Sequence, residues 1–166
     1  MPAKIKICGI STPEALDADD AVIADALVAA KLNALQLHGS ESPERVAQLR
    51  ARFGKPVWKA LPVASASDVA RAAAYAGAAD LILFDAKTPK GALPGGMGLA
   101  FDWSLLAGYR GALPWGLAGG LNPTNVAEAI ARTGAPLVDT SSGVESAPGV
   151  KDTDKITNFA FAVRLA

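Results

Sequence analysis

Three side chains with chemical potential stand at the ends of short apolar runs, far apart in the chain. Cys8 follows KIKI, His38 follows LQL and Asp85 follows LILF. A cysteine thiol can do chemistry at the mouth of a pocket, and a carboxyl that emerges into a desolvated site can serve as a general acid. These residue types fit proton-transfer chemistry if the fold brings them to one place.

Each of these residues also has a plain structural interpretation. A free cysteine most often packs in a core, and a lone histidine is more often structural, although His38 could also shape a pocket floor or hydrogen bond toward the cysteine. Asp85 could equally cap the turn that follows it. Position alone does not choose between these alternatives.

Two turns rich in glycine and serine indicate an anion site. AGGLNP (118–123) and DTSSGVE (139–145) each follow an apolar run. Glycines let the backbone approach a ligand closely, and SSG before Val144 and Glu145 can open a short helix whose free N–H groups accept an anion. The alternative is that both stretches only make tight turns, but their joint position at the last two strand ends favours phosphate.

The elements that must position these residues alternate between strands and helices. Apolar runs without clean alternation predict buried strands at 5–10, 34–39, 57–63, 80–86, 114–120 and 136–143. Capping residues and apolar periodicity predict helices at 11–32, 42–54, 65–77, 122–134 and 152–165. This order predicts an α/β fold with a parallel sheet, in which ligands bind beyond the carboxyl ends of the strands. One long irregular loop is expected at 87–103.

Composition excludes several classes of protein. The 166 residues predict one domain, 1–166, and 16 basic against 16 acidic residues offer no attraction to nucleic acid or to a membrane surface. One cysteine forms no internal disulfide, which predicts a cytoplasmic protein, and one cysteine with one histidine argues against structural zinc. GGMG (95–98) does not join a strand to a helix as a dinucleotide site requires, so we expect no cofactor.

Six motifs in order resemble the phosphoribosylanthranilate isomerases of tryptophan biosynthesis: KICGI, LNALQLHG, LFDAKTP, GGMGLAFDW, LAGGLNPTNV and VDTSSGVESAPGVKD. The resemblance implies a TIM-barrel-derived fold and a cofactor-free Amadori rearrangement of a phosphorylated sugar amine, an aldose–ketose type intramolecular oxidoreduction. It implies Cys8 as general base, Asp85 as general acid, and substrate contacts from His38, Gly119, Gly120, Ser142 and Gly143.

The chain also departs from that family. A full barrel of eight units needs at least about 200 residues, whereas only six strands are predicted here. The family's strand two, helix two and strand three are missing around Ala18 and Asp19, together with an arginine that binds the anthranilate carboxylate.

Six strands cannot preserve an eight-stranded mouth. Either the first strand pairs with the second predicted strand, or two open edges invite association or strand exchange with another copy. We therefore expect weak or absent turnover unless association rebuilds the wall. One alternative is a non-catalytic truncated scaffold, natural or engineered, that keeps a phosphate site. Another is a related barrel enzyme that acts on a different phosphorylated sugar, but the combination of the cysteine with the DAKTP motif argues against it.

Overall fold

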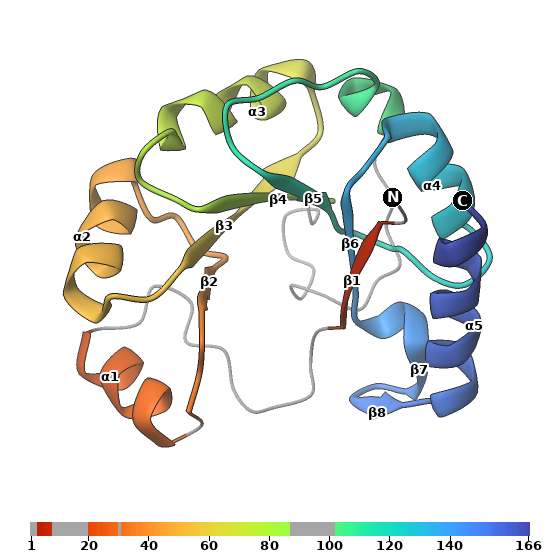
Figure 1. Ribbon diagram of the computed structural model, residues 1–166, viewed down its shortest axis with the longest axis horizontal. Coiled ribbons are helices and arrows are strands. Elements are labelled where there is room, and N and C mark those ends of the chain that lie inside the picture. Colours follow the sequence, from red (N-terminus) through yellow and green to blue (C-terminus); the bar gives the residue numbers. More distant parts are fainter. Residues whose placement is uncertain (1–2, 8–19, 30, 87–101) are drawn as a thin grey trace.

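Six parallel strands form one curled sheet. The computed structural model describes residues 3–7, 20–29, 31–86 and 102–166. The sheet contains β1 (Lys4–Ile7), β2 (Leu35–Leu37), β3 (Val57–Val63), β4 (Leu81–Ala86), β5 (Trp115–Leu117) and β6 (Leu137–Thr140). Their spatial order is β1-β6-β5-β4-β3-β2, and every neighbouring pair is parallel. The sheet curls into a half-barrel with its helices on the convex side (Figure 1).

The helices confirm most of the predicted pattern. They are α1 (Asp20–Ala29), α2 (Pro43–Phe53), α3 (Ala66–Ala70), α4 (Val126–Thr133) and α5 (Thr153–Leu165), with 3₁₀ turns η1 (Arg71–Tyr75), η2 (Trp103–Leu106) and η3 (Ser142–Val144). Helix α2 shows why the sequence signals work: the Ser42 hydroxyl accepts the Arg45 N–H, and Gly54 ends the helix in the left-handed conformation.

Several predicted boundaries were wrong. The predicted helix 11–32 does not reach residue 32, because Lys31 takes a positive φ of 49° and the Leu32 N–H bonds back to the Leu27 carbonyl. Residues 11–19 and 30 of this prediction lie outside the described residues, as do residues 87–101 of the predicted loop. Strand 114–120 stops at Leu117, since Gly119 and Gly120 both turn with positive φ. The hairpin of β7 (Glu145–Ala147) and β8 (Val150–Lys151) was not predicted.

The sheet has two open edges within the described part of the chain. There β1 pairs with β6 and β2 with β3, and no bridge joins β1 to β2. Of the two arrangements considered from the sequence, pairing of the first two predicted strands is therefore wrong for these residues. The curl of six strands leaves β1 and β2 at opposite ends of the arc (Figure 1).

Alternate residues of each strand face the two sides of the sheet. The main core lies on the helix-covered side and includes Val57, Leu61, Ile82, Phe84 and Val138. A smaller cluster of Ala60, Leu83 and Leu137 marks the concave side. Asp85 lies two residues beyond Leu83 in β4, so it belongs to the concave face at the carboxyl end of the sheet.

We expect Gly116→Val to lower the free energy of unfolding by roughly 1–3 kcal/mol, because it overpacks this smaller cluster. A Cβ at Gly116 would stand 2.9 Å from methyl carbons of both Leu83 and Leu137. Urea denaturation would measure the loss, with Ala131→Val on the exposed surface of α4 as the control. Equal stability of the two variants would contradict this account of the concave face.

Candidate active site

Two of the three predicted chemical side chains meet at the carboxyl edge of the sheet. Asp85 Oδ2 lies 3.2 Å from His38 Nε2, and Asp85 Oδ1 accepts the backbone N–H of Ala86 at 2.7 Å. The contact reaches across β3, which lies between β2 and β4. Side-chain exposure is 43% for His38 and 23% for Asp85, so both groups border solvent.

Asp85 therefore combines the two interpretations that the sequence left open. One carboxylate oxygen holds the following backbone N–H, as a cap does, and the other faces an imidazole. Cys8 lies outside the described residues, so the predicted closeness of His38 to the cysteine stays a prediction.

The turn after β5 packs directly against this pair. Gly119 and Gly120 have φ values of 86° and 65°, a region that favours glycine. A Cβ at Gly119 would lie 2.4 Å from the Ala86 nitrogen and 2.9 Å from Asp85 Oδ1. Glycine is needed here both for the turn and for the close approach to β4.

The turn after β6 packs against the first turn. A Cβ on Gly143 would stand 1.9 Å from the Leu121 carbonyl oxygen, and the Thr140 hydroxyl donates to that same oxygen at 2.7 Å. Ser142 and Gly143 lie in η3, the short helical turn that SSG was expected to open. The four residues predicted to hold phosphate therefore belong to two adjoining turns. Among the described residues, the backbone N–H groups of Gly119, Gly120 and Gly143 find no acceptor.

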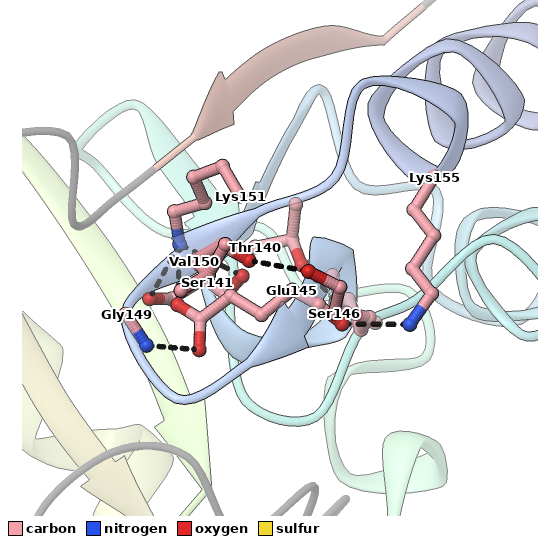
Figure 2. Close-up of polar contacts among 9 residues, drawn as sticks. Thr140, Ser141, Glu145, Ser146, Gly149, Val150, Lys151 and Lys155 are labelled. Carbon is pink, nitrogen blue, oxygen red and sulfur yellow. Dashed lines mark hydrogen bonds and ion pairs between the residues drawn. The ribbon is translucent and has the colours of Figure 1, made fainter.

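A hairpin holds the second turn in place (Figure 2). Lys151 Nζ donates to the Ser141 carbonyl at 3.0 Å and to Glu145 Oε1 at 2.7 Å. Glu145 Oε2 accepts the Gly149 N–H at 3.1 Å, and Lys155 Nζ donates to the Glu145 carbonyl. We call the contacts of Glu145 with Lys151 and Gly149 the Glu145 latch. The sequence analysis did not predict it, although the opposite charges of Glu145 and Lys151 on either side of the Pro148–Gly149 turn indicate a hairpin.

The described residues form no metal site. Among them, no group of three histidine, cysteine, aspartate or glutamate side chains could hold a metal ion. The described helices include none that is long and apolar enough to cross a membrane.

Comparison with known proteins shows the family of this chain. Residues 15–162 match the family model of N-(5'phosphoribosyl)anthranilate (PRA) isomerase. The chain belongs to this isomerase family. It is 55% identical over 150 residues to the N-(5'-phosphoribosyl)anthranilate isomerase of Paramagnetospirillum magneticum, an alignment that covers 90% of this chain and 70% of the relative.

Solved structures of the family share its fold. Phosphoribosyl anthranilate isomerase from Thermotoga maritima superimposes with a TM-score of 0.79 at 37% identity, covering 98% of this chain and 73% of that one. A family member in complex with reduced 1-(o-carboxyphenylamino)-1-deoxyribulose 5-phosphate gives a TM-score of 0.75 at 33% identity and covers 98% and 71%. The strand order and the half-barrel thus represent a large part of a TIM-barrel-type fold.

The Glu145 latch predicts a pH-dependent contribution to stability. The hydrogen bond from Lys151, followed by that from the Gly149 N–H, lowers the pKa of Glu145 below its ordinary value of 4.5. A carboxyl with a lowered folded-state pKa stabilises the fold above its unfolded pKa, and this contribution is lost as the pH falls through the folded value. Glu145→Gln should therefore destabilise the chain more at pH 7 than at pH 3.

Urea denaturation at both pH values measures the difference. Glu128→Gln on the exposed surface of α4 is the matched control. If Glu145→Gln lowers the free energy of unfolding by as much at pH 3 as at pH 7, the ionised Glu145 carboxylate is not the source of the stabilisation.

Proposed function

We propose that this chain catalyses the Amadori rearrangement of N-(5'-phosphoribosyl)anthranilate to 1-(2-carboxyphenylamino)-1-deoxyribulose 5-phosphate, a step of tryptophan biosynthesis in the cytoplasm. The observation that carries the proposal is the contact of Asp85 with His38 beside the glycine turns, in a chain of the isomerase family. The active unit is one βα-barrel-like domain formed by residues 1–166.

The reaction needs one acid and one base. Asp85 protonates the furanose ring oxygen, the bond from that oxygen to C1 breaks, and the anthranilate nitrogen lone pair forms the C1 iminium. Cys8 then takes the proton from C2, and the resulting enolamine tautomerises to the ketone. His38 stands within hydrogen-bond distance of the Asp85 carboxyl and holds it toward the substrate. The substrate's own iminium accepts the electrons, so no cofactor enters this mechanism.

The two glycine turns supply the phosphate site. The backbone N–H groups of Gly119, Gly120 and Gly143, which have no acceptor among the described residues, bind the phosphate oxygens together with Ser142. Because the Gly119 turn touches Asp85, phosphate bound there places the sugar ring near the acid.

Substitution of the acid and the base tests the proposal. Asp85→Asn and Cys8→Ser should each lower kcat about 10²–10⁴-fold, the range expected for loss of general acid–base catalysis. The fluorescence of the anthranilate substrate follows its consumption, and Asp154→Asn, in the exposed first turn of α5, should leave the rate unchanged. A non-catalytic scaffold would give no isomerisation above background, or a residual rate that neither substitution changes.

We also propose that a second copy of the chain completes the site. All six strands run parallel, so a two-fold axis along the barrel would set the open edge of β1 in one protomer against β2 of its partner. Such pairing would join the open edges of the two six-stranded sheets and close the barrel around the site.

Specific activity should then rise with protein concentration over the range in which light scattering after gel filtration shows the monomer converting to a dimer. Ile5→Pro would serve as the edge variant. The Lys4 N–H bonds to the Pro136 carbonyl on the β6 side, so the N–H of the next residue, Ile5, faces the open edge, and its loss should shift the chain to the monomer and lower activity. A monomer that isomerises the substrate at ordinary enzymatic rates would exclude this second proposal and leave the first intact.

A further inference from the structure

A charged side chain lies in the middle of the buried central part of the sheet. Lys59 of β3 is 1% exposed, on the helix-facing side shared by Val57 and Leu61. A buried ammonium group is unfavourable unless its hydrogen bonds are satisfied. Lys59 Nζ donates to the Gly39 carbonyl at 2.7 Å and to Glu41 Oε2 at 2.8 Å.

The partners of Lys59 belong to the segment that leaves β2. Glu41 is itself held by Tyr75 of η1, whose hydroxyl donates to the Glu41 carbonyl at 2.8 Å. Tyr75 is buried, and burial raises the pKa of its hydroxyl. Segment 39–41 is thus held both by Lys59 of β3 and by Tyr75 of η1.

This segment begins at the residue after His38. Strand β2 has only three residues, and its last register position pairs Leu37 with Lys59. The pairing of β2 with β3 ends at Leu37, before His38. The backbone that follows His38 is therefore held by the contacts of segment 39–41. The strand that separates His38 from Asp85 therefore also carries the side chain that anchors the segment after His38.

We propose that Lys59 is a positioning residue for the active site: through Gly39 and Glu41 it holds the backbone after β2 so that the His38 imidazole faces Asp85. Lys59 lies on the opposite face of β3 from the concave cluster, and its ammonium group binds Gly39 and Glu41 rather than His38 or Asp85. Its effect on catalysis rests on the proposed function, whereas its effect on His38 does not.

The single histidine of the chain makes this effect measurable without substrate. The imidazole Cε1–Hε1 signal in a carbon–proton NMR spectrum belongs to His38 alone. Asp85→Asn should move this signal at fixed pH, because it removes the facing carboxylate. Lys59→Met, which keeps the length of the side chain but not its charge, should move the signal in the same direction, whereas Lys55→Met just before β3 should leave it in place.

A purely stabilising role gives a different result. If Lys59→Met lowers the unfolding temperature but leaves the His38 signal at its wild-type position, the proposal is overturned. Should Lys59→Met not fold, the double variant Lys59→Met with Glu41→Gln removes both buried charges together, and Tyr75→Phe removes only the hydroxyl contact. Each of these should also shift the signal toward that of Asp85→Asn, and failure of both to do so overturns the proposal.

Kinetics supply the second arm. Lys59→Met should lower kcat about tenfold or more, as a small misplacement of a catalytic group does, and should cause little further loss in a His38→Gln background. Independent, multiplicative losses would overturn the positioning role. If wild type shows no isomerisation, the proposed function fails while the NMR result still decides the inference.

Discussion

The site depends on one geometric constraint: three neighbouring parallel strands must end at the same edge of the sheet. His38 leaves β2 and Asp85 closes β4, and the 3.2 Å contact between them spans β3. A slip of one residue between β3 and β4 would turn Asp85 from the concave face to the helix-covered face. The register in which Pro62 pairs with Asp85 is therefore necessary for the contact between the Asp85 carboxyl and His38.

Close backbone packing supplies the second half of the site. Gly119 fits against Ala86 and Asp85, and Gly143 fits against the Leu121 carbonyl, in positions that admit no Cβ. These glycines have a structural reason that is independent of any ligand. Among the described residues, the backbone N–H groups of these turns find no acceptor, and free backbone N–H groups can bind an anion.

The sequence was informative wherever a local signal determined the structure. The apolar run 57–63 became β3 without a change of boundary, and Ser42 and Gly54 capped α2 as their types predict. Asp85 and the two turns could be found because parallel strands bring their carboxyl ends together. Local signals could not reveal that His38 faces Asp85 across a third strand, or that Lys59, within an apolar run, binds the segment after β2. Both depend on tertiary contacts between residues far apart in the sequence.

The half-barrel contains the edge that carries Asp85 and the glycine turns, and within the described residues its sheet ends in two open strands. We propose that this remaining edge still binds and orients the sugar phosphate. A crystal structure of the chain with a reduced analogue of the proposed product tests it most directly. We predict phosphate on the N–H groups of Gly119, Gly120 and Gly143, with the Asp85 carboxyl in hydrogen-bond contact with the oxygen that was in the furanose ring. Phosphate bound elsewhere, or a sugar chain out of reach of Asp85, would contradict the account.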